Sequence, residues 1–562
     1  MPPRLLHPDQ YELVARDPPE SPEAFDLDDA GFESQSLIKP SYLRHRPRVL
    51  HWLIARLPAR VRYLLYNGAF RRTHSRAAKP HRQCLRRLSI RRIGFLFYGF
   101  LSIIIALVIV TGLFRPSYTR PPAHYQVLRS IALATQEQGR ANPNNEKVFI
   151  AASIYDKGGR LVNGDWGTAV LNLIELLGYE NVFLSIYEND SGSDAKAALQ
   201  EFEHKVKCNS KLIFEEHLSL EEIPKVTLPD GTERIKRIEY LAKVRNRALR
   251  PLDESNSPHF DKLLYLNDVI FDPIDAVQLL FSTNVDETGR PVYRAACAVD
   301  FINPFKFYDT FATRDLEGYS MGLPFYPWFS GAGKADSRQD VLDGKDAVRV
   351  KSCWGGMVAF DAKWFQSSGP SAPAESIGAI DSDPGTDRNL NWHRSDPNLA
   401  PPIESRSASL PIRFRAETDL FWDASECCLI HADLQSIGDP PEQSAYTGIY
   451  MNPFIRVAYG SRTLKWLGFT RRFERLYSIP HSLLNHLVGL PWFNPRRTEK
   501  GDELHKNKVW VPGDKDVGGG SFQEFERHVG NGGFCGSRKL QVIREKPSEG
   551  EKNWEFVPVP PI

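Results

Sequence analysis

From residue 146 onward, short apolar runs that fit β-strands alternate with longer runs whose apolar residues recur at helical spacing. The strand-like runs are residues 148–155, 182–187 and 212–214, and the helix-like runs between them are residues 168–177 and 194–205. Such alternation is typical of βαβ units, in which helices cover a mainly parallel sheet. The sequence therefore predicts an α/β fold in this region.

The same pattern continues toward the C-terminus. Residues 235–249 place their apolar side chains on one face of a helix, and further strands are predicted at residues 262–266, 292–299, 348–360 and 427–431. Residues 366–411 are rich in Ser, Pro, Gly, Asp and Asn, which is too polar for a core, so they are predicted to form an inserted surface loop. The predicted domain covers residues 146–460, and residues 461–562 form a C-terminal extension.

A different pattern precedes this domain. Residues 93–114 form an uncharged apolar stretch of 22 residues, long enough to cross a bilayer as one helix. Residues 1–92 hold 18 basic and 9 acidic groups, so the positive-inside rule keeps the N-terminus in the cytosol. We expect a single-pass type II membrane protein with a basic, largely disordered cytosolic tail (1–92), a signal anchor in the lipid bilayer (93–114) and a proline-containing stem (115–145).

Charge and cysteine content narrow the possible partners. The basic tail suits anionic lipid headgroups beside the span, and no nucleic-acid partner is expected. Six of the seven cysteines follow the span, which allows one or two disulfide bonds. Their spacing matches no zinc template, and the adjacent Cys427 and Cys428 are expected to be half-buried in a strand.

Acidic residues end the predicted strand over 262–266. Asn267 and Asp268 follow it directly, and Asp272 comes four residues later. In an open α/β sheet, ligands bind beyond the carboxyl ends of the strands, where carboxylates can hold a divalent cation against a diphosphate. The alternative is a helix start at Asp272-Pro273 with no metal. His431, at the end of another predicted strand, could complete a metal shell begun by Asp268, although a lone histidine there is more often part of the core.

A polar loop follows the predicted strand over 182–187. Its members Glu188, Asn189 and Asp194 can present oxygens and amides to ribose or phosphate groups. A capped turn at the start of the next helix is an equally good interpretation. The sequence Asn189-Asp190-Ser191 is also a glycosylation sequon, which would be blocked if the loop lined a donor pocket.

Two further segments carry candidate chemistry. Arg245 and Asn246 close the helix over 235–249, where a guanidinium can either cap the helix or neutralise a pyrophosphate. Trp354, Gly355 and Gly356 would let a sugar approach the backbone beside an aromatic face, and the alternative is a tight bend.

These segments together resemble the fungal capsule-associated mannosyltransferases of glycosyltransferase family 69, whose members include cryptococcal α-1,3-mannosyltransferases. The resemblance spans roughly residues 146–460. It rests on ENDSGS at 188–193, RNRAL at 245–249, LNDVIF at 266–271, CAVDFINPF at 297–305, SCWGG at 352–356, SECCLIHAD at 425–433 and NPFIRVAY at 452–459.

The resemblance implies a retaining enzyme with a GT-A type fold, a Rossmann-like mixed and mainly parallel sheet. It implies a Golgi membrane location and transfer of mannose from GDP-mannose to a mannoside acceptor in cell-wall, capsule or glycoconjugate synthesis. A divalent cation, Mn²⁺ or Mg²⁺, is expected at Asp268. Arg245 would stabilise the diphosphate, and Asp300 and Glu426 are carboxylates for acceptor contacts or a local base.

One departure from the generic GT-A pattern stands out, because the Asp-x-Asp motif appears here as Asn267-Asp268-Val269, with a single metal-capable carboxylate. This departure leaves open a non-catalytic, GT-A-like component of a glycan assembly or export complex. A UDP-sugar donor also stays open, since no residue visibly reads guanine. A glycosidase needs a pair of facing carboxylates, and the sequence makes no such pair evident.

Overall fold

The computed structural model describes residues 81–255, 257–326, 328–366, 410–437, 447–501, 503–513, 519–544 and 553–561. They fall into two compact units, one ending at Arg115 and the other beginning at Pro116. Residues 1–80 of the predicted tail and residues 367–409 of the predicted inserted loop lie outside the described residues.

In its described part, the first unit is one helix, α3 (His81–Phe114). Its segment Gly94–Phe114 has 21 residues and a mean hydropathy of 2.5. At 1.5 Å per residue this segment is about 31 Å long, close to the hydrocarbon thickness of a bilayer. Its length and composition therefore fit the predicted anchor over 93–114.

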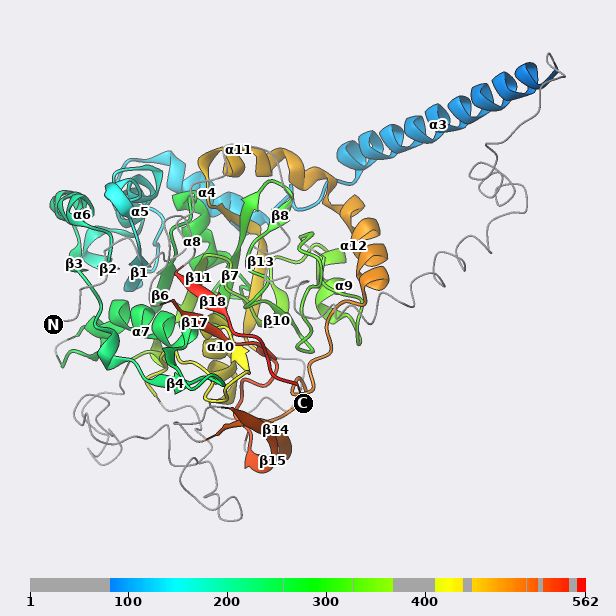
Figure 1. Ribbon diagram of the computed structural model, residues 1–562. Helices are drawn as coiled ribbons and strands as arrows, with labels where there is room; N and C mark the ends of the chain where they lie inside the picture. Colours follow the sequence, from blue (N-terminus) through cyan, green and yellow to red (C-terminus); the bar gives the residue numbers. More distant parts are fainter. Residues whose placement is uncertain are drawn as a thin grey trace. The chain divides into compact units, whose positions relative to one another are not determined.

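The second unit is built around a ten-stranded sheet in the order β3-β2-β1-β6-β11-β7-β13-β10-β9, with β8 paired to β7 (Figure 1). Its strands are β1 (Val148–Ile154), β2 (Val182–Asn189), β3 (Asn209–Glu215), β6 (Lys262–Leu266), β7 (Ala295–Asn303), β8 (Lys306–Phe307), β9 (Arg314–Asp315), β10 (Val348–Ser352), β11 (Met357–Asp361) and β13 (Ile449–Ala458). β3, β2, β1 and β6 are parallel, as are β7 and β13, whereas β11 runs antiparallel between β6 and β7. The predicted α/β fold with a mixed, mainly parallel sheet is confirmed.

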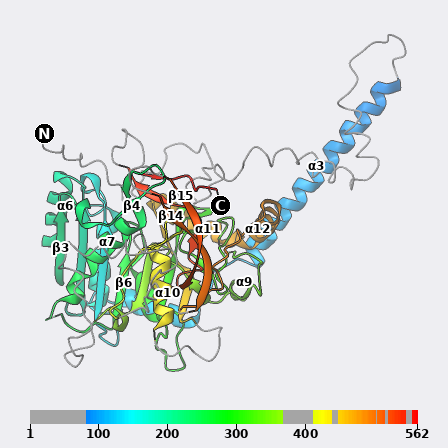
Figure 2. The same ribbon diagram turned by 60° about the horizontal axis from the view of Figure 1, so that its bottom comes forward.

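Helices cover both faces of this sheet, which is why its central strands are apolar almost throughout. α5 (Asp165–Leu177) and α8 (Pro273–Ser282) contact each other on one face. α7 (Arg237–Leu249) and α10 (Glu426–Ser436) contact each other on the opposite face, which Figure 2 turns toward the reader. The other helices are α4 (Ala123–Ala134), α6 (Ser193–Lys205), α9 (Asp336–Leu342), α11 (Ser461–Thr470) and α12 (Glu474–Val488).

Short strand pairs complete the second unit. They are β4 (Lys225–Thr227) with β5 (Glu233–Ile235), β12 (Asp423–Ala424) with β16 (Gly536–Ser537), β14 (Leu504–Pro512) with β15 (Gly520–His528), and β17 (Gln541–Ile543) with β18 (Trp554–Phe556). β17 contacts both α7 and β5, and a disulfide joins Cys428 of α10 to Cys535. Residues of the predicted C-terminal extension are therefore tied to the α/β core.

Most predicted elements of residues 146–300 are confirmed with small shifts at their ends. The strand predicted over 262–266 is β6 (Lys262–Leu266), and the helix predicted over 235–249 is α7, which begins two residues later at Arg237. The single strand predicted over 348–360 is instead the two strands β10 and β11, because the tight turn at Gly355 and Gly356 reverses the chain between them.

The strand predicted over 427–431 is wrong, because these residues belong to helix α10. The Ser425 side chain accepts a hydrogen bond from the Cys427 backbone and so caps the helix start. Every residue from Glu426 to Leu434 is buried, so the segment has no polar face to reveal a helical period. A fully buried helix and a buried strand look alike in such a short apolar run.

The predicted stem over 115–145 also needs correction, because it packs against the α/β unit. α4 buries Tyr125, Leu128 and Ala132 and contacts α8. The Tyr125 hydroxyl accepts a hydrogen bond of 2.7 Å from Asn452 on β13. Prolines mark the entry to α4, since its N-cap is Pro122, rather than an extended spacer.

Candidate active site

The carboxyl ends of β1, β2 and β6 lie side by side at one edge of the sheet. Ile154 of β1 pairs with Glu188 of β2, and Ala152 of β1 pairs with Leu266 of β6. The polar residues that end or follow these strands therefore gather at the same edge, as the sequence predicted. They include Asp156, which the sequence analysis missed because nothing local distinguishes it from a turn residue.

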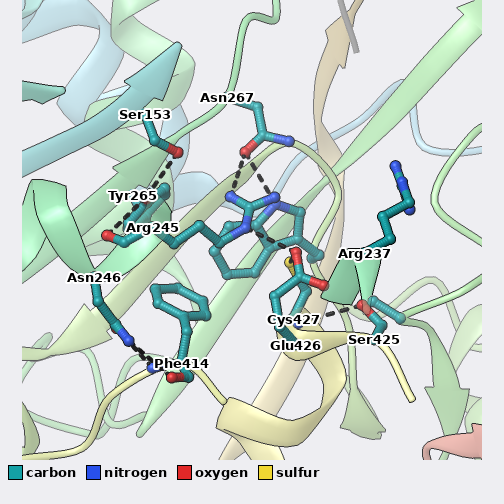
Figure 3. Close-up of polar contacts among 12 residues, drawn as sticks. Ser153, Arg237, Arg245, Asn246, Tyr265, Asn267, Phe414, Ser425, Glu426 and Cys427 are labelled. Carbon is teal, nitrogen blue, oxygen red and sulfur yellow. Dashed lines mark hydrogen bonds and ion pairs between the residues drawn. The ribbon is translucent and has the colours of Figure 1, made fainter. Parts of the chain in front are cut away.

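Arg245 crosses this edge in a tightly defined position (Figure 3). Its Nε donates to Oε1 of Glu426 at 2.9 Å, and its Nη1 donates to Oδ1 of Asn267 at 3.1 Å. The guanidinium carbon lies 4.7 Å from the ring centre of Trp354, and the rings of Tyr265 and Phe414 are close by at 5.5 and 5.7 Å. Its Nη2 forms no hydrogen bond within the described residues, so this amino group is free to bind a ligand oxygen.

Asn267 orients the side chains around it. Its Oδ1 also accepts a hydrogen bond of 3.2 Å from the Trp354 indole, and its backbone carbonyl accepts one of 2.9 Å from Trp166. The side-chain oxygen is thus already shared between a guanidinium and an indole. Asn267 therefore positions both Arg245 and Trp354.

Asp268 differs from its neighbour, because no described residue donates a hydrogen bond or an ion pair to its carboxylate. It is half-buried, and burial raises its pKa to about 7 despite the opposing effects of its own backbone amide and of Arg245. A carboxylate without protein partners at this edge has the chemistry of a cation ligand. Mg²⁺ and similar ions are commonly held by only one or two carboxylates together with substrate phosphates.

The structure does not bring the predicted metal ligands Asp268, Asp272 and His431 together. Asp272 is the N-cap of α8, accepting a hydrogen bond of 2.9 Å from Ile274. Within the described ranges, the His, Cys, Asp and Glu ligand atoms that cluster in a group of three belong to Cys297, Cys353 and His431. The two cysteines are joined in a disulfide and offer no thiolate.

His431 is a core residue and not part of this edge. Its ring is fully buried on α10 and stacks on Phe360 of β11, with ring centres 5.7 Å apart. Burial lowers its pKa to about 4, so the imidazole is neutral at physiological pH. The prediction that it completes the shell of Asp268 is corrected, because the strand on which that prediction depended is a helix facing the hydrophobic core.

Glu188 and Asn189 line the end of β2 as completely buried side chains. Neither carboxylate oxygen of Glu188 has a hydrogen-bond partner among the described residues, and burial raises its pKa to about 8. Asn189 donates to the Tyr240 hydroxyl at 2.8 Å, while its own oxygen is unpartnered. Buried acceptors are rarely left unpaired, so these oxygens suit a ligand that supplies hydroxyl or N–H donors.

The burial of Asn189 also determines whether the sequon at residues 189–191 is accessible for glycosylation. Asn189 is 1% exposed, and its side-chain nitrogen is bonded to Tyr240 and Asp190. The sequon therefore offers no accessible acceptor in the folded protein. Asp194, the third residue predicted for this loop, is exposed in the first turn of α6 and lies away from the buried pair in the surface layer.

Asn246, predicted to bind the donor, is fully engaged elsewhere. Its Nδ2 donates to the Phe414 carbonyl at 2.8 Å, and its Oδ1 accepts from the Phe414 amide at 2.9 Å. This double contact holds Phe414 against Arg245. Asn246 therefore acts on the site through Phe414.

The turn Trp354-Gly355-Gly356 needs both of its glycines. Their φ angles are 59° and 68°, and a Cβ at Gly355 would lie 2.0 Å from the Ala298 carbonyl oxygen. A Cβ at Gly356 would lie 2.6 Å from Val269, in the acidic turn after β6. Close backbone approach is thus what brings Trp354 to Asn267, and Trp354 itself is almost fully buried beneath Arg245.

A pair of carboxylates is formed by Asp300 of β7 and Asp309, which follows β8. Asp300 is completely buried, accepting hydrogen bonds from the Asp309 amide at 3.2 Å and the Tyr459 hydroxyl at 3.3 Å. Asp309 is half-buried, and its Oδ2 faces the Gly355 amide at 3.4 Å. Burial raises the pKa of Asp300 well above its usual range and that of Asp309 to about 6. Sequence analysis found Asp300 but missed Asp309, which follows an ordinary loop and has no motif around it.

Glu426 completes the site from α10. Its carboxylate is buried and binds Arg245, and the Cys427 thiol donates to the same oxygen at 3.4 Å. With both contacts on one oxygen, Glu426 fixes the direction of the guanidinium.

A separate pocket of about 390 Å³, lined by Glu146, Lys262 and Asp361 among others, lies at the opposite edge of the sheet, where β1 and β6 begin. It shares no residue with this site.

Comparison with known proteins bears on this arrangement. A family model described as cryptococcal mannosyltransferase 1 matches residues 147–433. No curated protein matches the chain. Among solved structures, the chain is similar to mannosyltransferase PcManGT from Pyrobaculum calidifontis in complex with GDP-Man and Mn²⁺, at 10% identity over 70% of this chain and 86% of that one. The TM-score of 0.29 is too low for that likeness to support an argument. Since the family match covers just over half of the chain, the protein belongs to the cryptococcal mannosyltransferase 1 family and is a glycosyltransferase.

Proposed function

We propose that the protein transfers mannose from GDP-mannose to a hydroxyl of a mannoside acceptor, forming an α-1,3 linkage with retention of configuration. Membership of the cryptococcal mannosyltransferase 1 family supports mannose as the transferred sugar. The proposal depends on two side chains at one edge of the sheet. The Arg245 guanidinium is held by two hydrogen bonds and keeps one amino group for a ligand, and the Asp268 carboxylate has no partner among the described residues. Together they supply the two charges that a nucleoside diphosphate leaving group requires.

In this proposal Arg245 binds the diphosphate through Nη2 while Glu426 and Asn267 hold the other two guanidinium nitrogens. Because the guanidinium is already oriented, it needs little rearrangement when charge develops on the leaving phosphate. Asp268 fits a divalent cation, Mn²⁺ or Mg²⁺, since its carboxylate has no protein partner. When bound, such a cation neutralises phosphate charge as a Lewis acid.

The buried oxygens of Glu188 and Asn189 are assigned to the hydroxyl groups of the donor ribose. The Asn189 oxygen needs a hydrogen-bond donor, and the Glu188 carboxyl, whose pKa is raised to about 8, can both donate and accept; adjacent ribose hydroxyls can serve both. Asp309 and Trp354 are assigned to the acceptor side. With its pKa near 6, Asp309 is ionised at neutral pH and can accept a hydrogen bond from the attacking hydroxyl.

We place the protein in the Golgi membrane or another secretory-pathway membrane as a single-pass type II protein. The support is the apolar segment Gly94–Phe114 and the excess of basic residues before it. Two disulfides in the unit after this segment, Cys297–Cys353 and Cys428–Cys535, suit an oxidising lumen. The active site would then face the lumen.

A donor screen tests the proposal. Purified full-length protein is given GDP-mannose, GDP-fucose, UDP-glucose and UDP-galactose with mannobiose acceptors, and the product linkage is read by NMR. We expect mannose transfer from GDP-mannose alone, with an α-configured product, and loss of transfer in Arg245→Ala. Transfer from a UDP-sugar in preference to GDP-mannose would overturn the donor assignment.

A second candidate is a non-catalytic component of a glycan assembly or export complex. Asn267 favours it, because the site has one carboxylate where an Asp-x-Asp motif has two. Binding distinguishes the candidates: a transferase is stabilised against heat by GDP with Mn²⁺, following mass action, and a component without a donor site is not.

A further inference from the structure

Helix α12 buries polar side chains and exposes apolar ones, the reverse of an ordinary surface helix. Its buried residues are Glu474, His481 and Asn485. On its outer side, Ile479, Leu483 and Leu487 are 62%, 65% and 67% exposed. Because these three residues are spaced by four, they form a single apolar stripe along the helix.

The inverted orientation is fixed by specific contacts on the buried side. Asn485 accepts a hydrogen bond of 2.9 Å from the Leu323 amide, and His481 lies 3.0 Å from the Met321 carbonyl. Glu474 forms a buried ion pair with Arg456 of β13. Turning the stripe inward would break all three contacts, so the apolar face is held outward by the fold.

The exposed apolar surface continues into α11. Trp466 and Phe469 of α11 are about half exposed and their rings contact each other, with centres 5.9 Å apart. Phe469 in turn contacts Phe473, which lies between α11 and α12, at 5.3 Å. After α12, Trp492 is 56% exposed. We call the exposed residues of this surface the α11–α12 face: Trp466, Phe469, Ile479, Leu483, Leu487 and Trp492.

Basic residues outnumber acidic ones in the segment that carries this face. Residues 461–493 contain five basic residues and one acidic residue. The acidic residue is Glu474, which is buried against Arg456, whereas Arg462, Lys465 and Arg472 are exposed. Exposed apolar and tryptophan side chains bordered by cations are typical of surfaces that bind the headgroup region of a bilayer.

The face also lies where the chain enters the α/β unit. Tyr118 is buried against Phe454, with ring centres 5.0 Å apart, and its carbonyl accepts a hydrogen bond of 3.1 Å from Arg471. Arg471 belongs to the short segment that joins α11 to α12. Tyr118 comes four positions after Phe114, the end of the apolar segment, and four steps along the chain span at most about 14 Å. The covalent chain therefore keeps this part of the unit within reach of the bilayer surface.

We propose that the α11–α12 face docks on the surface of the lipid bilayer that the anchor spans and holds the catalytic unit against the membrane. The proposal rests on the membrane anchor proposed above. A second copy of this chain is the less suitable occupant, because a face paired with itself would bring the exposed Arg462 and Lys465 close to the same residues of the other copy.

Tryptophan quenching by brominated lipids tests this docking. The full-length protein is reconstituted into vesicles of phosphatidylcholine and phosphatidylserine, with and without bromine in the acyl chains near the headgroup. Trp466→Phe/Trp492→Phe is expected to lose at least half of the bromine-dependent quenching. The control Trp364→Phe, at a half-buried residue after β11, is expected to keep it. Both changes keep an aromatic ring at each position, and equal thermal unfolding checks the fold.

A charge-reversal variant gives an independent measurement. Arg462→Glu/Lys465→Glu/Arg472→Glu is expected to lower quenching in vesicles that contain phosphatidylserine and to change it little in phosphatidylcholine alone. Equal quenching in the wild type and the double tryptophan variant overturns the proposal. So does cross-linking between copies that carry Leu483→Cys, which would assign the face to self-association. Release of the whole protein by alkaline carbonate identifies failure of the anchor instead.

Discussion

Arg245 and Asn267, 22 residues apart in the sequence, are joined by a hydrogen bond of 3.1 Å from Nη1 to Oδ1. The same oxygen accepts from Trp354, so one amide oxygen holds both the cation and the aromatic ring beneath it. An oxygen used in this way is not needed as a metal ligand. In Asn267-Asp268, Asp268 is therefore the one residue with a carboxylate, and Asn267 is a positioning residue for Arg245 and Trp354.

Removing that oxygen should weaken donor binding. Loss of a hydrogen bond to a charged group corresponds to about 1.5–3 kcal/mol, so Asn267→Ala is expected to raise KM for the donor about tenfold or more. Asn267→Asp keeps an acceptor in place and is expected to stay within a few-fold of the wild type. Steady-state kinetics of the two variants checks this, and equal losses in both would contradict the positioning role.

Asp268→Asn should separate activity from stability. We expect transfer to fall by at least about 100-fold, since loss of Lewis-acid assistance corresponds to several kcal/mol. Thermal stability should be unchanged or higher, because burial raises the pKa of Asp268 and the fold thus disfavours its ionised form. The control is Asp272→Asn at the N-cap of α8, which should retain activity. Activity lost in Asp272→Asn but kept in Asp268→Asn would reverse the assignment.

Glu188 should make stability depend on pH. Its pKa is raised to about 8 in the fold by burial, so the folded state binds an extra proton between the ordinary carboxyl pKa and pH 8. Stability should therefore fall as pH rises through this window and level off above it, and Glu188→Gln should remove that slope. Thermal unfolding of both proteins from pH 5 to 9 measures the difference, and parallel curves would show that the carboxyl is not desolvated.

Asp309 should set the acid limb of activity. Because burial places its pKa at about 6, transfer is expected to decline as pH falls through 6 and the carboxylate gains a proton. Asp309→Asn should lose most activity together with this limb. Asp300→Asn should retain the limb, since burial raises the pKa of Asp300 well above its usual range and so disfavours its ionised form. The pH–rate profiles of the wild type, Asp309→Asn and Asp300→Asn test this assignment. If the loss of activity below pH 6 persists in Asp309→Asn, another group is responsible for it.

The disulfide between Cys428 and Cys535 should support the site from a distance. It closes 107 residues of sequence and fixes α10, which carries Glu426. Cross-links of this loop length typically contribute about 2–4 kcal/mol, so Cys428→Ser/Cys535→Ser should lower Tm and reduce activity with it. Unfolding followed by circular dichroism, with activity measured on the same sample, checks both. An unchanged Tm would mean that packing alone holds the C-terminal residues.

Local pattern was enough to predict much of this protein. The apolar runs located β1, β2, β6 and α7, and the order of strands and helices placed Glu188, Asn267 and Asp268 at one edge of the sheet. The length of the uncharged apolar run over residues 93–114 was likewise enough to predict a membrane-spanning helix. These features depend on neighbouring residues, whose periodicity is written directly in the sequence.

Other features were decided only by tertiary structure. Glu426 lies 181 residues from the Arg245 that it binds, and Asp309 comes close to Gly355 only because β7 and β11 pair. The sequence of α10 resembled a strand because the helix is buried on every side. α12 exposes its apolar face because its polar side chains make their contacts inside the protein. The sequence determined which residues could carry the chemistry. Pairing of distant strands determined their partners, because hydrogen bonds and burial depend on distances in space that a local pattern does not record.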